Sequence, residues 1–237
     1  MQLSDARVLV VGMGGLGCPA SLALVRAGVG RLRIADDDVV ELHNLHRQIL
    51  FEDADVGQRK VEVARRALSR LGDAEIEPVF ARFLPENAIE LLRNIDLVVE
   101  GCDNVPTKFL VSDACFLSKV AVIHAAAVAW HGTALAVGPA GGPCYRCVFE
   151  DIPEGGAPNC AEVGAMGPAV GRVAALQVDL AFRAIAGLSP WGQMRRSDGL
   201  TGRWRDTMLQ ARAECILCGH SPSIRSITRA QYTQETA

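Results

Sequence analysis

The sequence predicts an α/β protein with a doubly wound, mostly parallel sheet of the Rossmann type. Apolar runs typical of buried strands alternate with segments of helical spacing over residues 8–124, and such alternation favours a sheet with helices on both faces. The first apolar run ends in the glycine-rich turn GMGGLG, and the second ends in the acidic residue Asp36. A strand, a glycine turn, a helix and a strand with a terminal acid are typical of nucleotide-binding sheets.

The elements of the first half follow in order from their residue patterns. Short aliphatic runs predict buried strands. They lie at residues 8–11, 31–36, 75–80, 95–101 and 120–124. Apolar residues at helical spacing predict helices. They lie at residues 19–27, 61–71, 85–94 and 106–119. Pro78 predicts an edge position or an irregularity for the third strand, because proline cannot donate a hydrogen bond within a sheet.

The second half combines a loop-rich region with further regular elements. We expect a strand at 133–137, a glycine- and proline-rich loop at 138–168 and an apolar helix at 169–186. A hairpin with its turn near Gly202 is expected over residues 199–209. The C-terminal part therefore contains β-structure in addition to a helix.

Composition and charge limit the class of protein. A chain of 237 residues with 49% hydrophobic residues can form a sizeable core, and we interpret 1–237 as a single domain without a linker. Its nucleotide-binding part is 1–137, and its C-terminal extension is 138–237. A net charge of −3 argues against nucleic acid as a partner. No apolar stretch is long enough to span a membrane and no secretory signal is recognisable, so we expect a cytoplasmic location.

The glycine turn suits a bound phosphate, and its glycines are candidate cofactor-binding residues. They are Gly12, Gly14, Gly15 and Gly17. The first glycine lets the chain turn out of the strand, the second lets the backbone approach a phosphate, and the last lets the helix lie close to the strand. Asp36 is expected to accept hydrogen bonds from ribose hydroxyls. These residues alone do not separate ATP from NAD.

The residues after Asp36 favour a triphosphate over a nicotinamide. A dehydrogenase needs a proton donor or acceptor, for which His124 is a candidate. The polar stretch after the second strand instead supplies Asn44, Arg47, Gln48 and Lys60. Arginine and lysine bind phosphate oxygens, although many such side chains are only solvated surface charges. Asp103 follows a strand and is a candidate magnesium ligand, or alternatively the cap of the next helix.

Several motifs together resemble the ThiF/MoeB/HesA family, adenylyltransferases akin to ubiquitin-activating enzymes. In chain order they are GMGGLG, NLHRQ, VGQRK, GCDN, CYRC and CILCG. The resemblance implies ATP-dependent adenylation of the C-terminal glycine of a small ubiquitin-like sulfur carrier that ends in Gly-Gly. Asp36 would hold the ribose, and Asp103 would act through Mg²⁺ at the α-phosphate. The phosphates would be contacted by Asn44, Arg47, Gln48 and Lys60. Asn104, in the same GCDN motif, is a further cofactor-binding candidate, and Arg47, Lys60 and Asp103 are the catalytic candidates.

The resemblance also implies partners, and the sequence departs from it in two places. A homodimer is expected, with carrier binding in the extension 138–237. Family members usually begin with a segment whose arginine reaches into the partner's ATP site, but here the glycine turn starts by Gly12. No rhodanese-like domain is recognisable, so sulfur is expected from a separate donor protein. A degenerate member that binds a carrier without activating it, or an NAD-dependent oxidoreductase, are the alternatives.

Four of the eight cysteines form a CxxC…CxxC pattern that predicts a zinc site. They are Cys144, Cys147, Cys215 and Cys218. Two such pairs fill a tetrahedral shell and leave no open position, so the Zn²⁺ is expected to be structural. A redox pair or a metal-free thiol pair are the alternatives. In this family a cysteine at the place of Cys160 can bond covalently to the carrier, or it is a spectator. Cys18, Cys102 and Cys115 are expected to be buried.

Overall fold

An eight-stranded sheet runs through the computed structural model, which describes residues 1–139, 141–153 and 164–232. The strands are β1 (Arg7–Val11), β2 (Arg31–Ala35), β3 (Glu75–Val79), β4 (Leu97–Glu100), β5 (Ala121–Val128), β6 (His131–Val137), β7 (Gln193–Asp198) and β8 (Trp204–Met208). Their order across the sheet is β3-β2-β1-β4-β5-β6-β7-β8. The first five in this order are parallel, and β6, β7 and β8 are antiparallel to their neighbours. The predicted fold class is confirmed.

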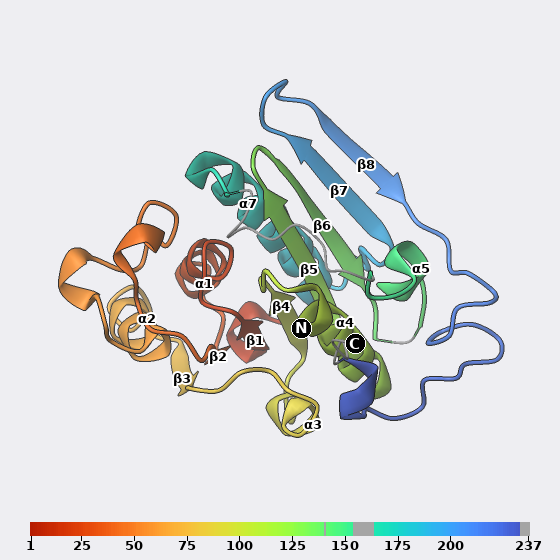
Figure 1. Cartoon of the computed structure of the whole chain (residues 1–237). Coiled ribbons are helices and arrows are strands. Elements are labelled where there is room, and N and C mark those ends of the chain that lie inside the picture. Colours follow the sequence, from red (N-terminus) through yellow and green to blue (C-terminus); the bar gives the residue numbers. More distant parts are fainter. Residues whose placement is uncertain (140, 154–163, 233–237) are drawn as a thin grey trace.

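Helices cover both faces of the sheet (Figure 1). They are α1 (Gly17–Arg26), α2 (Lys60–Leu68), α3 (Ala88–Leu91), α4 (Val105–Leu117), α5 (Arg146–Phe149) and α7 (Gly167–Ile185). α1, α2 and α7 lie on one face, where Leu24, Ala64 and Leu180 join its core. α3 and α4 lie on the other face, where Leu91 and Phe109 do the same. The sheet is therefore the middle layer of three.

The central strands are buried on both faces, as their aliphatic runs predict. Val8 and Val10 of β1 belong to the core under α1, α2 and α7, while Leu9 and Val11 belong to the opposite core. All four are at most 2% exposed. β3 forms one edge of the sheet and contains Pro78, so the expected edge position is confirmed.

The C-terminal hairpin differs most from expectation. Its two strands are β7 and β8. Residues 199–203, which were expected to include the first strand of the hairpin, form its turn instead. Gly202 lies in this turn with φ +68°, as predicted. Two consecutive arginines conceal β7 in the sequence, because charged residues interrupt the apolar pattern of a strand. Elsewhere the helix expected at 85–94 shortens to α3, and β5 continues beyond His124.

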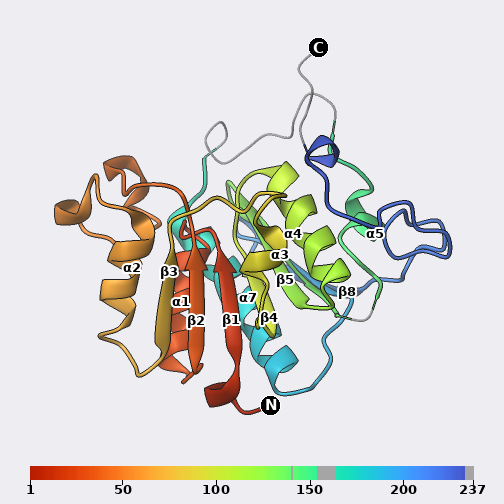
Figure 2. The same ribbon diagram turned by 90° about the horizontal axis from the view of Figure 1, so that it is seen from below.

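Loops converge at the carboxyl ends of the parallel strands. The strand order reverses between β1 and β4, and such a reversal leaves a crevice between the loops that follow the two strands. In Figure 2, the carboxyl ends of β1 and β2 point toward this crevice, away from the N-terminus. Arg7 lies at the opposite end of the strands, as the first residue of β1, and its guanidinium pairs with Asp96 at 2.7 Å. Among the described residues, no helix has both the length and the apolar character needed to cross a membrane.

Candidate active site

A cavity of about 630 Å³ opens among the loops at the carboxyl ends of β1, β2 and β4. Predicted site residues from several separate motifs line it: Gly12, Gly14, Gly15, Asp36, Asn44, Arg47, Gln48, Lys60, Asp103 and Asn104. Of the predicted nucleotide-binding residues, Gly17 is not in the lining. The fold thus brings together residues that are spread over most of the first half of the sequence.

Two glycines are required by the shape of the turn after β1. Gly12 has φ +91°, a left-handed conformation that disfavours residues with a side chain. A Cβ on Gly17 would lie 1.9 Å from the carbonyl oxygen of Gly12. A larger residue there would push α1 away from the turn, so Gly17 shapes the cavity without lining it.

Asp36 lies directly after β2 and contacts the glycine turn. Its Oδ2 accepts a hydrogen bond from the backbone N–H of Met13 at 2.6 Å, and its Oδ1 accepts one from the N–H of Asp38 at 2.8 Å. Burial raises the pKa of Asp36, and the charge of Lys60 opposes this shift. Because a carboxylate offers about four lone-pair sites, acceptor sites remain for the hydroxyls of a ligand.

Arg47 is held by a neighbour in its own loop. Its Nη2 donates to Oδ1 of Asn44 at 2.6 Å, and Nδ2 of Asn44 donates to Oε2 of Glu41 at 3.0 Å. Asn44 and Gln48 are buried, and Oε1 of Gln48 has no partner among the described residues. A guanidinium that is oriented in this way and lines the cavity is suited to bind phosphate oxygens.

Lys60 begins α2 and is only 4% exposed, yet it lines the same cavity. Its Nζ donates to Oδ2 of Asp38 at 2.8 Å. The side chain of Asp38 is 68% exposed, and an ion pair with such an exposed partner is weak. A ligand phosphate can therefore replace Asp38 without leaving the ammonium group unpaired.

Asp103 and Asn104 follow β4 and have different surroundings. Asp103 is exposed, and within the described part of the chain its side chain has no hydrogen-bond or ion-pair partner. Oδ1 of Asn104 accepts a hydrogen bond from the N–H of Thr107 at 2.9 Å and caps α4. The alternative role of Asp103 as the helix cap is therefore wrong, because Asn104 directly precedes the helix and takes that role.

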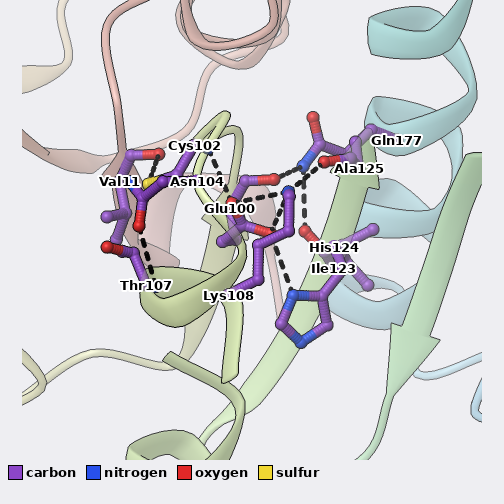
Figure 3. A network of polar contacts seen from close by, with 10 residues as sticks. All are labelled: Val11, Glu100, Cys102, Asn104, Thr107, Lys108, Ile123, His124, Ala125 and Gln177. Atoms are coloured by element: carbon purple, nitrogen blue, oxygen red, sulfur yellow. Dashed lines mark hydrogen bonds and ion pairs between the residues drawn. The ribbon is translucent and has the colours of Figure 1, made fainter. Parts of the chain in front are cut away.

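A buried polar network lies next to the turn that contains Asp103 (Figure 3). Glu100 ends β4 and is fully buried, and its Oε1 and Oε2 accept hydrogen bonds from Nζ of Lys108 at 3.0 and 2.9 Å. The same Nζ donates to the backbone oxygen of Ala125 at 2.6 Å. Nε2 of Gln177, from α7, donates to the backbone oxygen of Glu100 at 2.7 Å. Sequence reasoning missed these residues, and a lysine inside an apolar helix was the available signal.

His124 belongs to this network and does not line the cavity. Its side chain is 3% exposed, and its Nδ1 lies 3.0 Å from Oε2 of Glu100. Burial lowers the pKa of His124, so we assign a neutral ring whose Nδ1–H donates to the carboxylate. The alternative role of His124 in hydride transfer is therefore wrong, because the side chain does not reach a ligand in the cavity.

The four cysteines of the CxxC pairs meet in one cluster. The Sγ atoms of Cys144 and Cys215 are 3.5 Å apart, and those of Cys147 and Cys218 are 3.4 Å apart. All four lie within 4.8 Å of one another. Four thiolates bound at about 2.3 Å to one zinc ion lie about 3.8 Å apart, so the cluster fits tetrahedral zinc. The N–H of Arg212 also donates to Sγ of Cys147 at 3.4 Å.

The two residues between the first pair of cysteines insert into the core. The ring of Tyr145 packs against that of His124, with centroids 4.6 Å apart. Nε and Nη2 of Arg146 donate to the carboxylate of Asp113 at 3.0 and 2.9 Å, and both side chains are buried. Oη of Tyr232 donates to the same carboxylate at 2.8 Å. The cluster is thereby anchored to α4, the helix that begins at the cavity.

The other cysteines are placed mainly as expected. Cys18 and Cys115 are fully buried, and burial raises the pKa of Cys18 to about 12. Cys102 packs against the core and its Sγ donates to the backbone oxygen of Val11 at 3.6 Å, but the residue also lines the cavity and is less buried than expected. The turn after β4 opens toward the cavity, which explains the difference. Cys160 lies outside the described residues.

Known proteins resemble this chain over most of its length. Residues 1–217 match the profile of the ThiF family. The chain is 42% identical over 229 residues to "Adenylyltransferase and sulfurtransferase MOCS3" of Mus musculus, a match that covers 94% of the chain and 50% of that protein. It is 40% identical over 232 residues to the protein of the same name from Sus scrofa, with 96% and 51% covered. The chain spans about half the length of these relatives.

Solved structures share the fold. A crystal structure of E. coli MccB with ATP has a TM-score of 0.78 and 23% identity, and the match covers 92% of the chain and 67% of MccB. A crystal structure of PaaA has a TM-score of 0.73 and 22% identity, with 87% and 64% covered. At such identities the likeness concerns the fold alone. The match over residues 1–217 goes further, and it confirms the resemblance seen in the motifs: the chain belongs to the ThiF family.

Proposed function

We propose that the protein uses ATP to adenylate the C-terminal glycine carboxylate of a small ubiquitin-like sulfur-carrier protein, which prepares the carrier for thiocarboxylate formation. The main support is the convergence of Asp36, Arg47, Lys60 and Asp103 on one cavity at the switch in strand order. Membership of the ThiF family supports the same reaction, as does 42% identity to a mouse protein named adenylyltransferase and sulfurtransferase.

Each residue type has a task in this reaction. Asp36 accepts hydrogen bonds from the ribose hydroxyls, and the glycine turn lies along the phosphates. Arg47 and Lys60 bind the phosphate oxygens. Asn44 contributes by orienting Arg47, and Asn104 contributes by capping α4. Nε2 of Gln48 lies 3.9 Å from the position of a Cβ on Gly14, where it can donate to a phosphate oxygen.

The chemistry needs charge neutralisation more than acid–base catalysis. The attacking group is a carboxylate that is already ionised at pH 7, so no general base is required. The obstacle is the approach of an anion to a polyanion. Arg47 and Lys60 line the cavity, where they counter this repulsion and stabilise the charge that develops on the departing pyrophosphate. Fixing the two reactants in line supplies much of the remaining acceleration.

Asp103 fits the role of a magnesium ligand. It is an exposed carboxylate at the cavity without a partner among the described residues, and Mg²⁺ prefers such oxygen ligands together with substrate phosphates. When bound, Mg²⁺ supplies positive charge at the α-phosphate and the leaving pyrophosphate. We assign Asp103 to hold it.

A second cavity suits the tail of the carrier. It has a volume of about 610 Å³ and is lined by residues of β5 to β8, including Trp204. Ala126 and Val128 line both this cavity and the nucleotide cavity. The two cavities therefore meet at the end of β5, and a glycine-rich tail that lies in the second cavity would end beside the nucleotide cavity. We therefore assign carrier binding to the extension 138–237 together with the end of β5.

The cysteine cluster and the partners complete the proposal. Four cysteine ligands leave no open position, so we assign the cluster to a structural Zn²⁺. A homodimer, a sulfur-donor protein that acts after adenylation and a cytoplasmic location stay predictions from the sequence. A covalent bond between Cys160 and the carrier also stays a prediction.

Carrier-dependent exchange of labelled pyrophosphate into ATP tests this function. We expect exchange when Mg²⁺ and a ubiquitin-like carrier ending in Gly-Gly are both present, and none with the same carrier lacking its last two residues. Carrier binding without exchange would identify a degenerate member instead. Binding of NADH in place of ATP would identify an oxidoreductase.

A further inference from the structure

The turn that presents Asp103 is anchored by a side chain of the preceding strand. Oε1 of Glu100 accepts a hydrogen bond from the backbone N–H of Cys102 at 2.6 Å. The turn is also joined to β1 by the N–H of Gly101, which donates to the backbone oxygen of Val11 at 3.0 Å. Cys102 directly precedes Asp103, so a shift of Glu100 moves the backbone that carries the Asp103 carboxylate. We infer that Glu100 is a positioning residue, which fixes Asp103 at the nucleotide cavity through this turn.

Glu100 is itself held from several sides, which suits a fixed support (Figure 3). Lys108 donates to both of its carboxylate oxygens, His124 lies 3.0 Å from Oε2, and Gln177 donates to its backbone oxygen. Burial alone would raise the pKa of Glu100, but the charge of Lys108 and the hydrogen bonds outweigh it and lower this pKa. The carboxylate therefore stays ionised and keeps a strong acceptor for the N–H of Cys102.

Lys108 differs from the two cations assigned to phosphate. Its ammonium group contacts three acceptors, the two oxygens of Glu100 and the backbone oxygen of Ala125, and an ammonium group has three donors. Lys108 lines the cavity but has no donor left for a phosphate. Its bond to Ala125 ties Glu100 and the turn after β4 to β5, the strand whose Ala126 and Val128 line both cavities. The ion pair of Lys108 and Glu100 therefore positions the turn after β4 and does not bind phosphate.

The consequence concerns Mg²⁺ and rests on the proposed function, in which Asp103 holds that ion. Residues that orient a metal ligand typically contribute about 10- to 100-fold to metal affinity. Loss of the Glu100 contact should therefore weaken the gain in nucleotide affinity that Mg²⁺ provides. Affinity for the nucleotide in the absence of Mg²⁺ should stay nearly the same, because Asp36, Arg47 and Lys60 are not moved.

The double variant Glu100→Met/Lys108→Met tests this inference while limiting the risk of misfolding. It replaces a buried ion pair with apolar side chains of similar length, a change that is often neutral for stability. The readout is the Kd of the analogue α,β-methylene-ATP by calorimetry, with and without Mg²⁺. We expect the Mg²⁺-dependent gain in affinity to fall about tenfold or more. In Glu100→Gln, one oxygen remains for the N–H of Cys102, so this gain should stay close to wild type even where stability falls.

A matched control separates positioning from general stability. Asp113→Asn breaks another buried ion pair on the same helix, α4, whose members do not line the cavity. It should lower the melting temperature and leave the Mg²⁺-dependent gain unchanged. A double variant that keeps the full gain overturns the inference, as does an equal loss in Asp113→Asn. If the wild-type protein binds no ATP analogue and shows no exchange, the proposed function falls and the inference falls with it.

Discussion

The nucleotide cavity and the cysteine cluster both gather polar residues, but the molecule holds them in different ways. In the cavity the key contacts join residues near in sequence, such as Arg47 with Asn44, or the ends of adjacent strands. In the cluster, Cys144 and Cys215 come from segments 71 positions apart. The cavity is supported by the buried sheet, whereas much of the segment before the second cysteine pair is exposed. We infer that the sheet maintains the cavity, while the proposed zinc ion and buried charges maintain the extension.

Removal of the metal should have the largest effect and should be confined to one region. We expect Cys215→Ser to lose zinc and to open the extension to proteolysis, because a structural zinc site can contribute on the order of 10 kcal/mol to folding. Binding of an ATP analogue should persist. Zinc content, limited proteolysis and nucleotide titration measure the three effects. Cys115→Ser, a buried cysteine of α4 outside the cluster, is the control. Loss of both the extension and the cavity would break the distinction.

The buried charge pair of the extension should matter more for stability than the ion pair of the cavity. Arg146→Met leaves the fully buried Asp113 without its cation and should cost about 3–5 kcal/mol. Lys60→Met breaks a pair whose acid is mostly exposed and should cost at most about 1 kcal/mol. Urea denaturation compares the two variants. Equal losses would contradict this contrast.

For catalysis we expect the opposite order, because residues of the nucleotide cavity should matter more for the reaction rate than residues outside it. Arg47→Ala should reduce carrier-dependent pyrophosphate exchange by about 100- to 1,000-fold, the usual effect of removing one group that stabilises developing charge. That factor corresponds to about 2.7–4 kcal/mol of barrier. Arg66→Ala is the control, because Arg66 lies on α2, pairs with Asp55 and does not line the cavity. A retained rate in Arg47→Ala would remove Arg47 from the proposed mechanism.

The smallest effect is expected at the amino ends of the strands, on the side of the sheet away from the cavity. The hydrogen bond from Arg7 lowers the pKa of Asp96 below its usual 3.8. A carboxylate with a lowered pKa adds stability above its unfolded pKa and loses it as the pH falls through the folded pKa. Asp96→Asn should therefore be slightly less stable than wild type at pH 7, and the difference should shrink as the pH falls below 3.8 and through the lowered pKa of Asp96. A difference that persists at low pH would assign the effect to packing.

The sequence alone predicts the sheet and most of the cavity for one physical reason. Strands buried on both faces are aliphatic, and ligands bind at their carboxyl ends, so Asp36 and Asp103 could be placed from the strands before them. The strand β7 was not predicted, because its arginines interrupt the apolar pattern of a strand. The network of Glu100, Lys108 and Gln177 was not predicted, because its contacts join β4, α4 and α7, which are far apart in the sequence. The four cysteines were predictable because their chemistry requires a common partner.

A crystal structure with α,β-methylene-ATP and Mg²⁺ tests the nucleotide cavity most directly. We predict the ribose hydroxyls on Asp36, the phosphates between the glycine turn and the side chains of Arg47 and Lys60, and the metal ion on Asp103. A nucleotide bound elsewhere, or one whose phosphates leave Arg47 and Lys60 turned toward solvent, would contradict the proposed reaction.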